Sequence, residues 1–432
     1  MIPQLTFLTV VACITSRAVM LYSRRRLHES LVSLLGSWMY VLCLWIPAQL
    51  QNRGLLRSKI QEAGILAVPS QSDIADLSWN WSMEIVVIFA AELVAVSIFA
   101  RVRSQGRVSI SLRSESEWKS IALILCTIGL FATLAFPPDL INRGAEGQGV
   151  YVILRTMLVC GLAVLAYFGG FARLWIRVSI AAGAVFLVFE NVRSPLLVVV
   201  MALFAGLLSR GSLYRRTRLV QFGSLVLACV LAGSFMSEMR ANVTRDLGRS
   251  GSEVLESVME EPWLSPYEAG IDTLDGYRFS IEISQYEAAK PLDLLSPVTT
   301  FIPRSLWPEK PQSVSVELSA KYLGYRSSGQ FLSPIGYLRL ATGSYILAML
   351  LFFLAFTCFT AMVLRLWKSF WLTVILVVIF RFLLGGSAFD LYYGIMLSVS
   401  IWAAVLMYDL FFSSNRLADG RRHPGLSVRE VI

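Results

Sequence analysis

Long apolar runs recur along nearly the whole of this chain, and they constrain its fold more than any other feature. Of its 432 residues, 56% are hydrophobic and 16% are charged, whereas soluble domains carry about 25% charged residues. A run of about 18 or more apolar residues is long enough to cross a bilayer as a helix. These runs do not alternate in polarity, and a spanning segment must satisfy its own backbone hydrogen bonds. The sequence therefore predicts an all-α polytopic membrane protein rather than a barrel.

About eleven transmembrane helices of ~20 residues each are expected. They cover residues 3–22, 31–50, 83–100, 120–137, 149–168, 174–190, 195–209, 219–237, 339–363, 370–388 and 391–412. Basic side chains gather in alternate short loops and in the tail, at Arg24–Arg26, Arg101, Arg103, Arg107, Arg113, Lys119, Arg210, Arg215, Arg216, Arg218 and Arg421–Arg422. Because basic loops stay on the cytoplasmic side, this pattern predicts an N-terminus outside and a C-terminus inside.

The chain divides into four parts on this pattern. Residues 1–237 carry N-terminal transmembrane helices, residues 238–338 form one large extracytoplasmic loop, residues 339–412 return to transmembrane helices and residues 413–432 form a cytoplasmic tail. No basic residues precede the first apolar run, so it is expected to be a membrane span and not a cleaved signal.

The net charge of +9 is explained by the basic loops, so no nucleic-acid partner is expected. All six cysteines lie in apolar runs, and both histidines, His28 and His423, fall on the predicted cytoplasmic side. This distribution predicts neither a disulfide framework nor a metal site. No phosphate loop, nucleophile elbow or dinucleotide motif occurs in a supporting context.

The large loop has helical signals of its own. Ser250 and Glu253 have the spacing of a capping box, in which each side chain binds the other residue's backbone N–H. Ser265 followed by Pro266 suggests a second helix start with proline at the first helical position. Ile271, Leu274 and Ile281 then continue an apolar face. The loop is therefore expected to hold amphipathic helices that lie on the membrane or over a cavity.

Several arginines lie within or beside predicted spans, where burying a charge in the bilayer is energetically unfavourable. Arg381 falls within a predicted span, Arg193 at the outer boundary between two apolar runs, and Arg155 about two turns below the outer surface. Arg155 is expected to snorkel to the headgroups or to pair with Glu190 or Asp390. Arg193 and Arg381 are interpreted as functional, because both map near the level of the large loop.

The loop adds further cations and aromatic groups. Arg304, Trp307 and Lys310 lie in a segment stiffened by Pro303, Pro308 and Pro311, and Arg240 and Arg278 are further candidates. The arginine fork donates two parallel hydrogen bonds and keeps its charge, which suits a diphosphate. A solvated surface is the simpler account of Arg245, Arg249 and Lys321.

Carboxylates are plentiful, but spacing selects no general base among Glu268, Asp272, Asp275, Glu282 and Asp390. Glu84 and Glu92 lie on one side of the third predicted span. Such residues often mark an ion path in a transporter. Pairing with a neighbouring arginine accounts for them equally well.

Together these features resemble the bacterial O-antigen polymerases, also called oligosaccharide repeat-unit polymerases. The layout is similar, with one long outward loop before the last three spans. Pro303-Arg304 followed by Trp307-Pro308-Glu309-Lys310-Pro311 resembles the Pro-Arg…Lys-Pro signature of that family's loop. Ser333-Pro334-Ile335-Gly336-Tyr337 with Gly343, Arg193-Ser194 and Arg381 also resemble family positions. The resemblance covers residues 190 to 390.

The resemblance implies a GT-C-like glycosyltransferase in the bacterial cytoplasmic (inner) membrane. Its substrate would be an undecaprenyl-diphosphate-linked oligosaccharide, polymerised at the outer face without a cofactor or metal. Arg193, Arg304 and Arg381 would stabilise the leaving diphosphate as catalytic residues. Arg240, Arg278, Lys310 and Trp307 would bind substrate. A chain-length regulator and a flippase of the same pathway are candidate partners.

Three alternatives stay open at the level of sequence. An O-antigen ligase has a similar architecture but often carries an outward histidine, and none is expected here. A lipid-linked oligosaccharide flippase would usually show repeated halves, which this sequence lacks. A non-catalytic component of an export complex would not need buried arginines.

Overall fold

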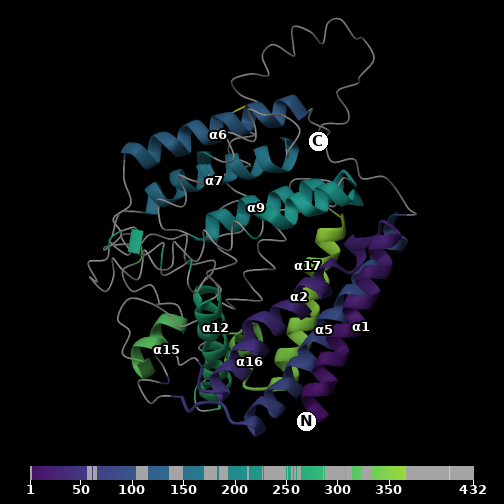
Figure 1. Ribbon diagram of the computed structural model, residues 1–432, viewed down its shortest axis with the longest axis vertical. Helices are drawn as coiled ribbons and strands as arrows, with labels where there is room; N and C mark the ends of the chain where they lie inside the picture. Colours follow the sequence, from purple (N-terminus) through teal and green to yellow (C-terminus); the bar gives the residue numbers. More distant parts are fainter. Residues whose placement is uncertain are drawn as a thin grey trace, which may run out of the picture.

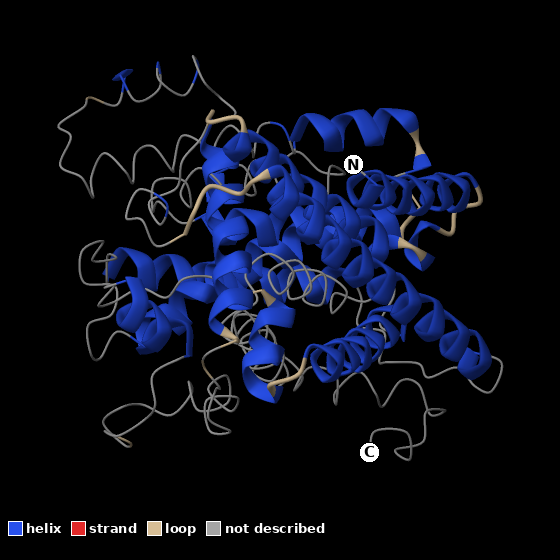
Figure 2. Cartoon of the chain, turned by 90° about the horizontal axis from the view of Figure 1, so that it is seen from below, coloured by secondary structure: helices blue, strands red, loops and turns tan. Residues whose placement is uncertain are grey.

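The structure is a computed structural model in which every regular element of the described residues is helical (Figures 1 and 2). It describes residues 2–55, 61, 66–103, 115–135, 149–169, 182–183, 193–211, 214–225, 227, 250, 252–253, 256, 259, 264–285, 287, 307, 314–323, 333–365 and 408. Four of the described helical segments are long and apolar enough to cross a membrane: Ile2–Ser23, Leu31–Asn52, Gln71–Ile98 and Glu117–Ala135. The chain is a helical membrane protein, as the apolar runs predict.

A first group of helices packs lengthwise around one apolar core (Figure 1). Its members are α1 (Ile2–Ser23), α2 (Leu31–Tyr40), η2 (Val41–Trp45), α3 (Ile46–Asn52), α5 (Gln71–Arg103) and α17 (Tyr345–Arg365). α2, η2 and α3 form one continuous rod whose central turn is π-helical. A π-helical turn contains an extra residue, so it changes the direction in which the following side chains point. Here this turn lies directly after Tyr40.

A second group consists of α6 (Glu115–Ala135), α7 (Gly149–Gly169) and α9 (Arg193–Ser209). These three helices lie side by side and cross the first group steeply (Figure 1). Trp118 of α6 stacks on Phe168 of α7 with ring centroids 5.4 Å apart. Their apolar side chains join the same core as the first group.

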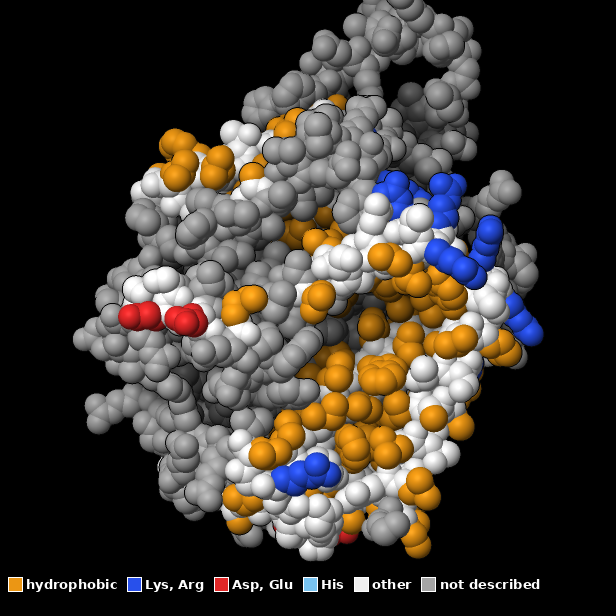
Figure 3. Space-filling model, in the orientation of Figure 1, with side chains coloured by type: hydrophobic (Ala, Val, Ile, Leu, Met, Phe, Trp, Pro, Cys, Tyr) orange, Lys and Arg blue, Asp and Glu red, His pale blue; other side chains and the backbone are white. Residues whose placement is uncertain are grey.

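The basic loops and the large-loop helices lie at opposite ends of the first group. Tyr22, at the end of α1, packs against Tyr214, with ring centroids 5.0 Å apart, so the loops that carry Arg24–Arg26 and Arg215–Arg218 adjoin (Figure 3). At the other end, Gln71 bonds to both Gln4 and Asn52. There α3 contacts α12 (Leu264–Ile283), which comes from the large loop. This arrangement is the one that the charge pattern predicts.

The third expected span begins much earlier than residue 83. Ser70 and Asp73 form a capping box at the start of α5, with Ser70 N 2.8 Å from Asp73 Oδ2 and Asp73 N 3.2 Å from Ser70 Oγ. Because these bonds satisfy free N–H groups of the first turn, the helix starts at Gln71. The same pattern predicted at Ser250 and Glu253 is confirmed by bonds of 2.8 and 3.3 Å.

The expected span 339–363 begins too early, because the helix is interrupted at Gly343 and starts again at Tyr345. α16 (Pro334–Thr342) is a separate helix, capped by Ser333, whose hydroxyl accepts from Gly336 N at 2.9 Å. Gly343 ends it in the left-handed conformation, with φ 67°, and α17 starts at Tyr345. The spans expected at 174–190, 370–388 and 391–412 lie essentially outside the described residues, and 219–237 is described only in part.

Replacing Gly343 by alanine should destabilise the α16–α17 junction by roughly 1–2 kcal/mol, because a Cβ strains the left-handed conformation. A Cβ at Gly343 would meet nothing within 4 Å, so the loss reports backbone strain and not a clash. Gly343→Asn should lose less, since asparagine tolerates this conformation. Thermal unfolding in detergent measures the difference. Equal losses for both variants would contradict this account.

Candidate functional site

The large-loop helix α12 is inserted among other helices rather than laid on a surface. It contacts α3, η2 and α16, and residues 274–277 are buried in succession. Because Glu282 of the same helix is exposed, the expected amphipathic character of the loop helices stays a prediction. α16 packs against α12 on the side that carries Ser280. The helix also begins at Leu264, two residues before Pro266.

A buried carboxylate fixes α12 to the first helix group. Glu84 of α5 accepts hydrogen bonds from Tyr40 Oη at 2.6 Å and from Tyr277 Oη at 2.7 Å. Tyr277 lies 193 residues from Glu84 in the sequence, and Glu84 is fully buried. A buried carboxylate without donors would be strongly unfavourable. The two hydroxyls therefore hold α2, α5 and α12 in one arrangement.

The protonation of Tyr277 suits this role as a donor. Burial raises the pKa of Tyr277 well above its usual value, and the neighbouring Glu84 raises that pKa further. Tyr277 therefore keeps its proton at any physiological pH. Its ring also packs edge-on against Trp81 of α5, with centroids 6.1 Å apart.

A polar cluster from α3 and α12 lies at the same end of the bundle. Gln51 Nε2 is 3.4 Å from Asp275 Oδ1, and Arg278 Nη1 is 3.9 Å from the same oxygen. Asp275 is fully buried, whereas 14% of the Arg278 side chain is exposed. Arg278 Nη1 is buried but makes no hydrogen bond among the described residues. The exposed part of the guanidinium lies beside this buried N–H.

Arg278 is charged despite its burial. Burial lowers the pKa of its guanidinium, and Asp275, Asp73 and Glu282 oppose that shift. Arginine starts so far above neutrality that the group stays protonated. A charged, partly exposed guanidinium with an unused N–H can bind a carboxylate or phosphate oxygen.

α16 holds α12 in place by close approach. Ser280 Oγ lies 3.1 Å from Ser333 Oγ, the cap of α16. A Cβ built on Gly336 would lie 2.0 Å from Ser280 Oγ and 2.4 Å from Ser280 Cβ. Only glycine allows the two helices to meet here. This contact gives a physical reason for the glycine in the Ser333–Tyr337 segment.

Glu92, the second carboxylate of α5, has a structural role. Its oxygens accept from Val32 N at 2.9 Å and Ser33 N at 3.2 Å, and from the Ser33 hydroxyl. Arg17 Nη1 lies 3.9 Å away. Glu92 thus satisfies N–H groups at the start of α2, which have no partner within their own helix. Of the two accounts left open for Glu92, pairing with an arginine fits this ion pair, which also explains how α1 carries Arg17 in an apolar run.

Only some of the expected site residues lie in the part of the chain that the structure describes. Arg278 lies in the cluster just described, and Trp307 is half-buried. Arg193 begins α9, with its side chain outside the description. Arg240, Arg304, Lys310 and Arg381 fall outside the described residues altogether, so their convergence with Arg278 stays a prediction. In the part of the chain that is described, no group of three or more His, Cys, Asp or Glu side chains could hold a metal.

Sequence reasoning overlooked Gln51, Tyr40 and Ser280. The signal for Gln51 was a polar residue at the end of an apolar run, and Asp275 was one of several carboxylates among which spacing did not choose. None of these residues belongs to a recognised sequence motif. Their partners come from other helices, so the pairings required the tertiary structure.

Tyr277→Phe should destabilise the protein by about 1–3 kcal/mol, because Glu84 loses a donor while it stays buried. Tyr40→Phe should act similarly, and the double variant should depart from additivity because both hydroxyls serve one carboxylate. Exposed Tyr322→Phe is the control, with stability close to wild type. Hydrogen exchange of residues 264–283 reports the loss locally. Exchange as slow as in wild type would contradict the anchoring role of Glu84.

Gly336→Ala should destabilise the protein by about 1–3 kcal/mol, because α16 must move away from α12. Adding Ser280→Gly removes both atoms that the new Cβ would meet most closely. The double variant should therefore be more stable than the sum of the two single losses predicts. Thermal unfolding in detergent measures all four proteins, and strict additivity would show that the two residues do not touch.

The site described here rests on the chain's own residues. Comparisons with protein-family models, curated proteins and solved structures returned no match to this sequence.

Proposed function

We propose that this protein is a membrane glycosyltransferase that polymerises undecaprenyl-diphosphate-linked oligosaccharide repeat units into a surface polysaccharide. The observation that carries the proposal is the place of Arg278. Its unused, buried N–H lies on a large-loop helix inserted at one end of the bundle, opposite the basic loops. A cation at this level suits a substrate whose chain lies in the bilayer and whose diphosphate lies at its surface.

The orientation follows from the charges. The adjoining loops around Arg24–Arg26 and Arg215–Arg218 would face the cytoplasm by the positive-inside rule. α12 and α16 would then lie on the outer side of the cytoplasmic membrane, with the N-terminus of α1. A GT-C-like arrangement of about eleven spans is part of this proposal, and its additional helices would come from residues outside the description.

The reaction needs hydrogen-bond donors that stabilise the negative charge on the leaving diphosphate. It also needs a base that takes the proton of the acceptor hydroxyl. An acceptor hydroxyl oxygen attacks the anomeric carbon, the bond from that carbon to the diphosphate breaks, and the lipid diphosphate leaves with the electron pair. Arg278 would bind the diphosphate, and Arg193, Arg304 and Arg381 would stabilise the charge that develops on it. Arg240, Lys310 and Trp307 would complete substrate binding. A carboxylate takes the hydroxyl proton, and no metal or cofactor is required.

The test compares the surface-glycan ladder of a deletion strain complemented with wild type, Arg278→Ala or Arg304→Ala. Deletion should reduce the ladder to single repeat units. Neither variant should restore long chains at normal membrane levels, because the leaving diphosphate loses a charge-assisted hydrogen bond. Lys321→Ala is the matched control from the same loop, since Lys321 is exposed and pairs with Glu287 on the surface. It should restore the full ladder.

The remaining outcomes separate the competing functions. Loss of all surface glycan, single units included, would point to a flippase or an export component. Accumulation of long lipid-linked chains that never reach their final acceptor would point to a ligase-type transferase. An unchanged ladder in the deletion strain would contradict the proposed polymerase function.

A further inference from the structure

Exposed arginines lie at the end of the bundle that carries the basic loops. Arg24 and Arg25 follow α1, and Arg215 and Arg216 lie at the start of the helical segment over residues 216–225. All four side chains are exposed, and none of them forms a salt bridge with another described residue. The described part of the chain therefore leaves these four positive charges without a carboxylate partner.

Two tyrosines bring the two basic loops together. The ring centroids of Tyr22 and Tyr214 are 5.0 Å apart, and the Tyr214 hydroxyl is hydrogen-bonded to the backbone of Leu27. Arg25 is close enough to that hydroxyl to act on it electrostatically. Basic side chains gather at this edge of the visible face, directly beside the broad apolar surface (Figure 3). Two loops that are far apart in the sequence thus present one cationic surface.

Arg25 has a backbone conformation that is unfavourable for arginine. Its φ is 58°, the only positive φ of a non-glycine residue in the part of the chain that the structure describes. Arg25 N lies 2.9 Å from Tyr22 O, and Arg26 N lies 2.7 Å from Leu21 O, which are the two bonds of a Schellman motif. Glycine is the usual residue at this position, because a Cβ is strained in the left-handed conformation. The fold alone favours glycine here, so a ligand for the side chain is the better explanation of the arginine.

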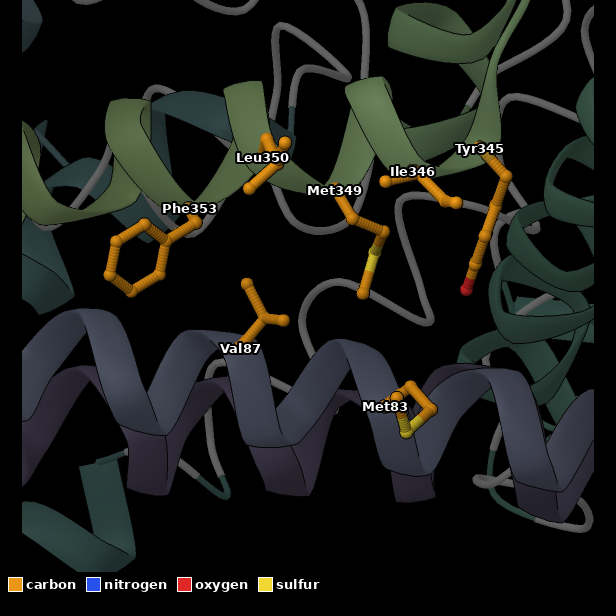
Figure 4. A pocket seen from close by; sticks show the side chains of 7 residues that line it. All are labelled: Met83, Val87, Tyr345, Ile346, Met349, Leu350 and Phe353. Carbon is orange, nitrogen blue, oxygen red and sulfur yellow. The ribbon is translucent and has the colours of Figure 1, made fainter.

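The surfaces next to this end of the bundle are apolar. Val19, one turn before Arg24, is 65% exposed, and Val220, one turn after Arg216, is 67% exposed. Further along the bundle, an open groove between α5 and α17 is lined by Met83, Val87, Tyr345, Ile346, Met349, Leu350 and Phe353 (Figure 4). A phospholipid fits such a border, since its acyl chains meet the apolar side chains while its phosphate meets the cations. A soluble acidic partner would leave the exposed apolar side chains without a role.

We propose that the surface formed by Arg24, Arg25, Arg215 and Arg216 binds the phosphate of an anionic phospholipid of the membrane. The guanidinium fork donates two parallel hydrogen bonds to phosphate oxygens, and basic pockets at helix ends recognise anionic headgroups. The positive-inside rule accounts for arginines on this side. It does not account for an arginine at a glycine position or for the convergence of two loops. The proposal concerns lipid binding and does not depend on the polymerase function.

The test is native mass spectrometry of the full-length protein in detergent, titrated with phosphatidylglycerol or with phosphatidylcholine of the same acyl chains. Wild type should bind phosphatidylglycerol more tightly. Arg25→Gly and Arg216→Gln should each weaken that binding by about five-fold, the effect of one arginine beside an anionic headgroup. Arg53→Gln is the matched control, because it removes one exposed arginine at the opposite end of the bundle, after α3. It should leave the affinity unchanged.

A second measurement separates binding from folding. In detergent without anionic lipid, Arg25→Gly should unfold at the same temperature as wild type or at a higher one, because glycine relieves the strained conformation. The variant should therefore keep its stability while it loses lipid. A lower unfolding temperature would make Arg25 a structural residue and would overturn the proposal.

Three further results would also overturn it. Equal affinities for the two lipids would mean that the headgroup charge is not recognised. Equal losses in Arg25→Gly and Arg53→Gln would mean that net charge, and not this surface, attracts the lipid. Displacement of phosphatidylglycerol by an equimolar amount of glycerol 3-phosphate would assign the surface to a soluble phosphate.

Discussion

A carboxylate enclosed by apolar helices must find hydrogen-bond donors, and the position of Glu84 makes the end of the bundle that holds α12 depend on this requirement. Its two donors come from α2 and from α12, so one side chain joins the N-terminal bundle to the large loop. Once Tyr277 is held, Arg278 and Asp275 are carried to the end of α3, where Gln51 meets them. The candidate site is thus a consequence of satisfying one buried charge.

The same constraint acts eight residues further along α5. Glu92 satisfies the start of α2 and faces Arg17 of α1. Because α5 carries both carboxylates on one side, its rotation relative to α1 and α2 is set at two levels. Polar groups in an apolar bundle leave few arrangements in which all are paired, and they therefore specify register more sharply than apolar contacts do.

The turn between α16 and α17 lies next to the candidate site. Tyr345 starts α17 directly after the turn at Gly343, and its hydroxyl lies near the Glu84 cluster. The interruption between α16 and α17 therefore does more than end a helix. It leaves α16 free to cover α12 through Gly336, while α17 turns into the bundle beside α5.

The sequence by itself determined that this is a helical membrane protein, where most of the described spans lie, and that the large loop and the basic loops occupy opposite ends. These features depend on local hydrophobicity and charge, which each segment carries independently of its neighbours. It also predicted the capping box at Ser250, because such a cap involves residues only three apart. Only the tertiary structure decided that α12 is buried, that Glu84 binds two tyrosines and that Gln51 meets Asp275. Those partners are up to 224 residues apart, and a local pattern cannot encode which distant donor a buried charge will find.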